Sequence, residues 1–327
     1  MNLYFAGGEA WADLLLPLGV KHILFSYFYF RSAIRGGRDG GKAATLLARL
    51  KRARQKGYRF FLDSGAFTYQ EKLRSGKGAS LPPPQAYYEE FAKFCEDYSD
   101  CFDIIAELDI EGAPLPNGDE LSINQVNEWT DDLIDRVGMK VMPVYHPARG
   151  KKWLQDWLLD TATPYVGFGS DSTTGANAVI AAAHRHGKWV HGFAQTRINT
   201  DLKFTNFDSV DSTTWLRADK YGGSCIFKNG KWIVLDHHHK HQRALHRDWY
   251  ESWGLDFSLI AKDDLYENRK ATVIAWRELA SSFEAKKMFQ TRGKLPYLLD
   301  AFVKGKPFTE HPILMAARMR AEAESAK

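Results

Sequence analysis

The 327-residue chain has few cysteines and no long apolar run. Its three cysteines, Cys95, Cys101 and Cys225, are too few for a disulfide framework in a chain of this length, which predicts a reducing, cytoplasmic setting. No stretch approaches the roughly 18 apolar residues of a membrane span, and no basic segment followed by an apolar run opens the chain. We therefore expect neither secretion nor membrane insertion.

The sequence also lacks a strong charge of either sign. Its 44 basic and 40 acidic residues leave a formal net charge of +4, so any basic surface for nucleic acid must be local. We find no internal repeat and no glycine–serine linker, and the length exceeds the roughly 250 residues of one barrel domain by a modest extension. These features predict one large domain followed by an extension.

Short apolar runs rich in β-branched and aromatic residues recur along the first two thirds of the chain. They are nearly continuous in hydrophobicity, as is typical of strands buried on both faces, and most are separated by segments long enough for a helix. The runs begin at Leu3, Ile23, Phe60, Asp103, Val141, Tyr165, Trp189 and Phe207. Alternating strands and helices imply parallel pairing, and eight strands predict a (β/α)8 or TIM barrel, with an open doubly wound sheet as the alternative.

A different pattern follows Val210. Residues 224–228 and 232–235 predict a β-hairpin that turns at Asn229 and Gly230, a favoured hairpin dipeptide. The chain beyond this hairpin is predicted to be helical. The expected fold is therefore an α/β TIM barrel over residues 1–236, which includes the hairpin, with a helical C-terminal extension over residues 237–327.

Polar residues that end the apolar runs are the first candidates for a site, because barrel enzymes carry their chemistry at the carboxyl ends of the strands. Asp63, Asp109 and Asp208 each follow such a run. A single aspartate in this position is commonly a helix cap. Three carboxylates in one barrel mouth repel one another, and this cost favours a catalytic use. These residues alone predict a carboxylate-rich barrel enzyme.

Two segments carry a resemblance to a known family. Residues 61–67 (FLDSGAF) resemble the Asp-Ser-Gly-Gly-Phe segment of the tRNA-guanine transglycosylase superfamily, with alanine at the second glycine, and residues 207–213 (FDSVDST) resemble its Phe-Asp-Cys-Val segment. Asp109 matches the position of the family's guanine-recognising aspartate, and residues 144–146 fall where the family has Val-Gln-Gly. Glycine-bearing strand ends at 167–169 and 190–193 match those around the base pocket, and the similarity spans roughly residues 60–215.

Two departures from the family pattern matter. The expected glutamine is replaced by Tyr145 or His146, so base recognition can differ. The family members that act on tRNA carry three cysteines and a histidine after the nucleophile strand, whereas this region offers only Cys225. Without that zinc element, and with opening segments at residues 3–7 and 23–27 that also resemble it, the chain is more similar to the divergent branch of phages and genomic islands that inserts 7-deazaguanine bases into DNA.

The resemblance implies a base-exchange reaction. Asp208 would be the nucleophile that forms a covalent aspartyl–nucleotide intermediate, and Asp63 would be its acid/base partner. A free 7-deazaguanine of the preQ0 type would replace guanine in DNA, with tRNA as the alternative substrate and no catalytic metal. The residues expected to contact the base are Asp109, Ser64, Tyr145, His146, Gly169, Gly192 and Phe67.

Several basic residues in expected loops are candidates for binding the nucleic-acid backbone: Arg35, Arg38, Arg149, Arg197 and Lys203. A zinc site formed by Cys225, His237, His239 and His246 is a weaker alternative, because the spacing matches no closed zinc motif well. A metal-dependent barrel hydrolase with ligands His146, His191, Asp171 and Asp208 and a noncatalytic nucleic-acid-binding barrel are the other hypotheses. The sequence leaves open a homodimer or an accessory protein.

Overall fold

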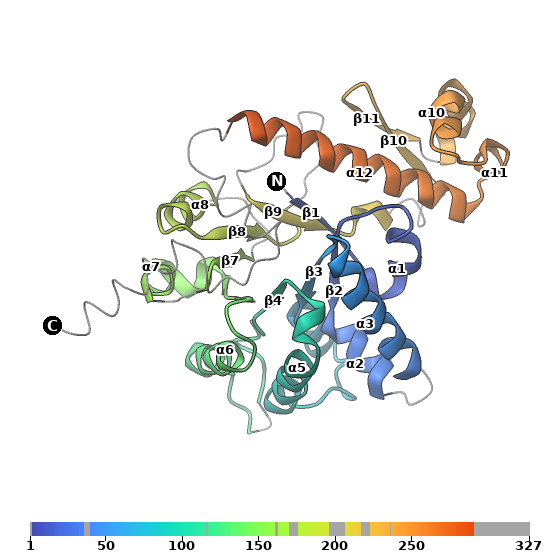
Figure 1. Cartoon of the computed structure of the whole chain (residues 1–327). Helices are drawn as coiled ribbons and strands as arrows, with labels where there is room; N and C mark the ends of the chain where they lie inside the picture. The colour runs from blue at the N-terminus through green and yellow to red at the C-terminus, as the bar shows by residue number, and fades with distance from the viewer. Residues whose placement is uncertain are drawn as a thin grey trace.

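The computed structural model describes residues 2–35, 40–115, 117–160, 163–169, 176–195, 207–216, 223–235 and 237–290. Nine parallel strands form one sheet in the order β5-β4-β3-β2-β1-β9-β8-β7-β6 (Figure 1). The strands are β1 (Asn2–Ala6), β2 (His22–Ser26), β3 (Arg59–Asp63), β4 (Ile104–Ala106), β5 (Val141–Met142), β6 (Val144–Tyr145), β7 (Tyr165–Phe168), β8 (Trp189–Gly192) and β9 (Ser209–Ser212).

The two ends of this sheet meet at one segment of chain. β5 and β6 are separated only by Pro143; β5 pairs with β4, and β6 pairs with β7. Proline has no N–H for the strand ladder, but its carbonyl accepts a hydrogen bond of 2.7 Å from the Gly167 N–H. Counting residues 141–145 as one strand gives eight strands around a nearly closed barrel, so the predicted TIM-type fold is confirmed.

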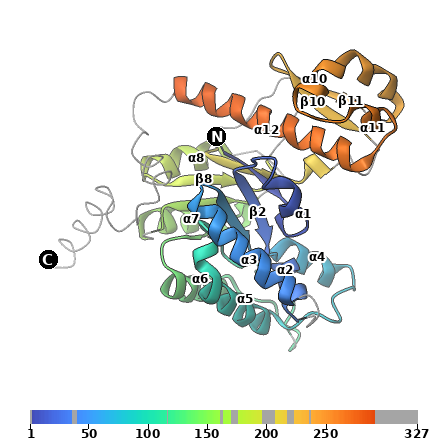
Figure 2. The ribbon, with the colours of Figure 1, turned by 45° about the vertical axis from the view of Figure 1, so that its right-hand side comes forward.

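Both faces of the strands are buried, and the residues alternate between them. Tyr4, Leu24, Phe61 and Trp189 fill the barrel interior. Their neighbours along the strands, such as Phe5, Phe25 and Phe60, pack outward against the helices. The helices that surround the barrel in Figures 1 and 2 are α1 (Gly8–Leu15), α2 (Tyr27–Arg35), α3 (Gly40–Gln55), α4 (Ala66–Arg74), α5 (Pro84–Tyr98), α6 (Ile123–Val137), α7 (Gly150–Asp160) and α8 (Ala176–Arg185).

The C-terminal part begins with the predicted hairpin. β10 (Ser224–Lys228) and β11 (Lys231–Leu235) pair antiparallel, and Asn229 and Gly230 turn between them with φ of 55° and 72°. The positive φ values are those that a two-residue hairpin turn requires. The helices that follow are the 3-10 helix η4 (His237–His246), α10 (Arg247–Ser252), α11 (Phe257–Ala261) and α12 (Leu265–Gln290).

The hairpin shares its core with these helices. β10 and β11 lie beside α10, α11 and α12 (Figure 2). Ile226 and Leu235 of the hairpin are buried with Tyr250, Ile260 and Ile274. This packing groups the hairpin with the C-terminal extension, although the sequence had placed it with the barrel. The same helix α12 also contributes Val273, Trp276 and Leu279 to the barrel's outer core, so one helix joins both parts. None of the helices within the described ranges is both long enough and apolar enough to cross a membrane.

Candidate active site

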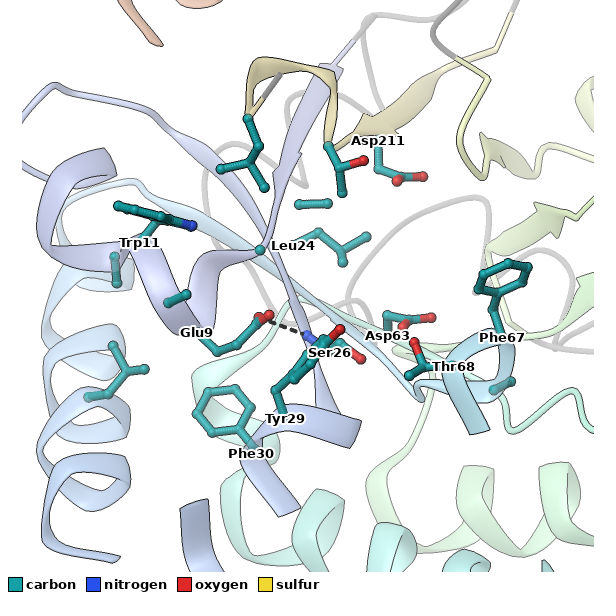
Figure 3. Close-up of a pocket in the computed structure, with 18 of the residues that line it drawn as sticks. Glu9, Trp11, Leu24, Ser26, Tyr29, Phe30, Asp63, Phe67, Thr68 and Asp211 are labelled. Atoms are coloured by element: carbon teal, nitrogen blue, oxygen red, sulfur yellow. Dashed lines mark hydrogen bonds between the residues drawn. The ribbon is translucent and has the colours of Figure 1, made fainter. Parts of the chain in front are cut away.

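A pocket of about 1400 Å³ opens at the carboxyl ends of the barrel strands. Residues at or just beyond the ends of most of the strands line it, and they include Ala6, Ser26, Asp63, Asp109, His146, Gly169, Ala194 and Asp211. Figure 3 shows Asp63 and Asp211 as they line this pocket. The pocket therefore lies where the fold class places active sites.

Asp63 is the last residue of β3, and the chain turns sharply after it. Gly65 has a φ of +80°, and its N–H donates a 3.0 Å hydrogen bond to Asp63 Oδ2. A Cβ on residue 65 would lie 2.6 Å from the Phe28 Cβ, so only glycine fits. Burial, and then the neighbouring Asp109 and Asp211, raise the pKa of Asp63 to about 7, against the opposing effect of the Gly65 N–H.

Asp211 lies in β9 and points into the same pocket. The N–H of Ala194 donates a 2.8 Å hydrogen bond to Asp211 Oδ1, and His191 Nε2 lies 3.3 Å from the same oxygen. On the other side of the ring, His191 Nδ1 is 2.9 Å from the Ser209 hydroxyl. If Nε2 carries a proton, His191 donates to Asp211, so the buried ring holds this carboxylate in place.

Asp208, the residue predicted to be the nucleophile, lies outside the pocket. It precedes β9 at the amino end of the barrel and is 4% exposed. Its Oδ2 accepts a 2.9 Å hydrogen bond from the Val190 N–H and lies 2.7 Å from Nε2 of His184 on α8. The structure corrects the assignment: strand alternation turns residues 208 and 210 toward the helices and residues 209 and 211 into the barrel.

Asp109 and His146 form a second polar group on the β4–β6 side of the pocket. His146 Nε2 lies 2.7 Å from Asp109 Oδ2. Burial lowers the pKa of His146, but Asp109 and Glu111 outweigh this effect and the net pKa is raised. A Cβ on Gly169 would lie 2.5 Å from His146 Cε1, so glycine makes room for this ring. The predicted pocket positions of Asp109, His146 and Gly169 agree with the structure.

Four other residues were expected to contact the base, and only one of them lines the pocket. Phe67 lines the pocket and is 77% exposed (Figure 3). Tyr145 is instead buried outside the barrel, with its ring near Trp153 and Phe168, because strand alternation turns it away from the mouth. Ser64 is fully buried and does not line the pocket. Gly192 also lies outside it: a Cβ there would meet the Phe207 ring at 2.7 Å, so this glycine serves packing.

Arg149 was expected to bind the nucleic-acid backbone, but its side chain is only 1% exposed. Two nitrogens of its guanidinium each lie 2.7 Å from a Glu111 carboxylate oxygen, and Nη1 lies 2.5 Å from Glu107 Oε1. Glu107 is fully buried, so it needs a cation beside it. The Arg149 expectation is wrong for this electrostatic reason. Arg38, Arg197 and Lys203, and the side chain of Arg35, lie outside the described residues.

The sequence predicts two alternative metal sites, one of a hydrolase and one that binds zinc. Asp208 lies at the amino end of β9 and does not join His146 in the pocket, so the hydrolase ligand set does not assemble as predicted. Asp171 and the side chains of His237 and His239 lie outside the described residues. Within the part of the chain that is described, no group of three or more histidine, cysteine or acidic side chains is arranged to hold a metal ion.

Three further pocket residues, Asp211, Glu9 and Ser26, are not among the candidates predicted from the sequence. Asp211 lies near the carboxyl end of β9 (Ser209–Ser212), whereas Asp208 precedes this strand, so a correct strand boundary would have identified Asp211. Glu9 follows the end of β1 by three residues and lines the pocket with Ser26. The same rule about strand ends, applied to the first strand, would have found Glu9.

Comparison of the chain with models of protein families and with characterised proteins found no match. The geometry of the site and the motifs in the sequence therefore carry the functional argument.

Proposed function

We propose that this protein is a transglycosylase that exchanges guanine in DNA for a 7-deazaguanine base, with Asp211 as nucleophile and Asp63 as acid/base. One observation supports the proposal most: Asp63, Asp109 and Asp211 line a single pocket at the carboxyl end of the barrel, where burial and then the two neighbouring carboxylates raise the pKa of Asp63 to about 7. Gathering three carboxylates is costly for stability and is typical of catalytic sites.

In the first step, a carboxylate oxygen of Asp211 attacks the anomeric carbon of the target nucleotide. The bond from that carbon to guanine N9 breaks as the carbon–oxygen bond forms, and Asp63 donates the proton that guanine takes away. In the second step, the incoming base loses its N9 proton to Asp63 and displaces Asp211 from the same carbon. Two displacements retain the configuration, and a group with a pKa near 7 suits both directions of proton transfer.

The base would lie toward Asp109 and His146. An ionised carboxylate accepts from both donors on one edge of guanine, the ring N–H and the exocyclic amine. The 2.7 Å contact with His146 holds Asp109 at this side of the pocket. A guanine inside a duplex cannot reach the barrel mouth, so the enzyme would flip the base out or act on a single strand. The choice of DNA over tRNA rests on the motif resemblance and the missing cysteine cluster.

The test is to trap the covalent intermediate. The protein is incubated with guanine-containing DNA or with tRNA, with and without a free preQ0-type base, and is analysed by denaturing gel, intact mass and nucleoside digestion. We expect an adduct with DNA and incorporation of the 7-deazaguanine, both lost in Asp211→Asn and kept in the matched control Asp208→Asn. An adduct with tRNA alone would move the substrate to tRNA. Metal-dependent release of a base without any adduct would replace the proposal with a hydrolase.

A further inference from the structure

The pocket is larger than one base requires. Pockets for drug-sized ligands have volumes of roughly 300–1,000 Å³, whereas this one has about 1400 Å³. The additional wall comes from the first three helices and not from the strand ends. We call this part the α1–α3 arm; it is lined by Glu9, Trp11, Tyr29, Phe30, Thr45 and Leu46. In Figure 3, Glu9, Tyr29 and Phe30 lie on one side of Ser26, and Asp63, Thr68 and Phe67 lie on the other.

Two polar groups stand where the arm meets the catalytic carboxylates. Glu9 Oε2 accepts a 3.2 Å hydrogen bond from the Ser26 N–H, which fixes its carboxylate inside the pocket. The buried Ser26 hydroxyl interacts with the Asp63 carboxylate and lowers its pKa, so it links Glu9 to the reacting centre. Ser26 pairs in register with Asp63, so these groups adjoin the reacting centre.

The arm also offers an aromatic surface. Tyr29 is 51% exposed although it lines the pocket. Trp11 lies on the same wall, with the Arg269 guanidinium 3.7 Å from its ring centroid. Lys42 and Arg49 of α3 line the pocket on this side as well. An aromatic face with cations nearby is a common arrangement for a nucleotide, because bases stack on rings and phosphates attract cations.

The order of the strands says which nucleotide would lie there. Asp109 and His146 follow β4 and β6, where the exchanged base would bind, whereas Glu9 and Ser26 belong to the β1 and β2 side. Asp63 on β3 and Asp211 on β9 flank β1 and β2. A sugar held between Asp63 and Asp211 therefore directs the adjoining nucleotide toward the arm.

We propose that the α1–α3 arm is a subsite for the nucleotide next to the exchanged guanine, and that Glu9 selects a base that carries an amino group there. An ionised carboxylate is an acceptor only, so it pairs with the amine of cytosine and not with the carbonyl at the same position of uracil. The pKa of Glu9, raised by burial to about 6, leaves the group mostly ionised at pH 7.5. This inference rests on the proposed base exchange.

The experiment compares oligonucleotides that carry deoxycytidine or deoxyuridine beside the target guanine, on the 5′ side in one series and on the 3′ side in another. These two bases have the same size and differ at the amine. We expect wild-type protein to exchange the cytosine-flanked guanine about tenfold faster in kcat/KM on one side. Glu9→Gln should bring this ratio to about one, since its amide accepts from Ser26 and can donate to uracil. Glu89→Gln, which makes the same change at an exposed carboxylate on α5 outside the pocket, should leave the ratio unchanged.

Binding of the same oligonucleotides to the Asp211→Asn protein, with and without Glu9→Gln, separates the two proposals. Exchange without a cytosine preference, or a preference that Glu9→Gln leaves intact in a folded protein, overturns the subsite while the base exchange stands. Absence of any exchange by the wild type overturns the proposed function. In that case a Glu9-dependent cytosine preference in binding still supports the subsite, and its absence overturns it.

Discussion

The carboxylates at the two ends of the barrel have different surroundings. At the amino end, Asp103 lies 2.6 Å from Arg54 and accepts from the Phe60 N–H, and Asp208 is held by His184 and the Val190 N–H. At the carboxyl end, Asp63, Asp109 and Asp211 share one pocket, where burial and then the two neighbouring carboxylates raise the pKa of Asp63. Carboxylates with dedicated partners stabilise a fold, whereas carboxylates that repel one another are retained at a cost that catalysis can explain.

The largest expected effect is a difference in base exchange between variants of Asp211 and of Asp208. Asp211→Asn should lower base exchange by about 10³-fold or more, because it removes the proposed nucleophile, and should change stability little. Asp208→Asn should keep exchange but lower the free energy of unfolding by about 1–3 kcal/mol, since it weakens buried hydrogen bonds. Exchange kinetics and urea unfolding of both variants measure this. Loss of exchange in a folded Asp208→Asn protein would contradict the assignment.

The next effect concerns Arg149 and the buried Glu107. Arg149→Met should destabilise the protein by about 3–5 kcal/mol, because it leaves a buried carboxylate without its cation. Lys152→Met is the matched control: its ion pair with Asp156 is exposed and should contribute under about 0.5 kcal/mol. Thermal unfolding compares the two. An Arg149→Met protein of normal stability with a weaker salt dependence of DNA binding would instead restore Arg149 as a phosphate contact.

Substitution of Gly169 at the barrel mouth and of Gly192 in the outer core should have different effects on kinetics and stability. Gly192→Ala should cost about 1–3 kcal/mol of stability, because its Cβ meets the Phe207 ring. Gly169→Ala should displace His146 from Asp109 and raise KM for the incoming base about tenfold, with a smaller effect on stability. Steady-state kinetics with denaturant unfolding tests both. The reverse pattern would place Gly192 at the base and Gly169 in the packing.

The smallest effect is the pH response of Asp63. Its proton is held more tightly in the folded than in the unfolded chain, so its contribution to stability is complete below about pH 4 and is lost as pH rises through about 7. Asp63→Asn should therefore stabilise the protein by about 1–2 kcal/mol at pH 8 and less at pH 5. Exchange by the wild type should fall above pH 7 as the acid form disappears. Equal stabilisation at both pH values would show that the pKa is not raised.

Much of the barrel could be predicted from the sequence, because the residue patterns that specify its strands, helices and turns are local. Runs such as residues 60–62 are apolar on both faces, and helical segments separate most of them, so parallel pairing followed directly. The hairpin at Asn229 and Gly230 depends on two residues that tolerate positive φ. Asp63 was placed at the mouth by the same logic, since it ends a buried run before a glycine turn.

Errors of one to three residues in the expected strand positions account for the wrong assignments on the strands. Neighbouring residues of a strand face opposite sides, so whether Asp208 or Asp211 enters the barrel depends on where β9 begins. The same alternation turns Tyr145 away from the pocket, where it was expected to contact the base. Arg149 could not be placed, because the carboxylates that capture it, Glu107 and Glu111, lie about forty positions earlier in the chain. The grouping of the hairpin with α12 is likewise a long-range contact.

The sequence by itself determined the fold class, the carboxylate-rich mouth and the turn residues, because continuous apolar runs and backbone preferences act within a few neighbouring residues. Only the tertiary structure decided which carboxylates meet. Asp63, Asp109 and Asp211 come from β3, the end of β4 and β9, and Glu9 comes from α1. Their meeting requires closure of the barrel, which brings residues about 150 positions apart into one pocket, and the same closure buries Asp63 and so raises its pKa.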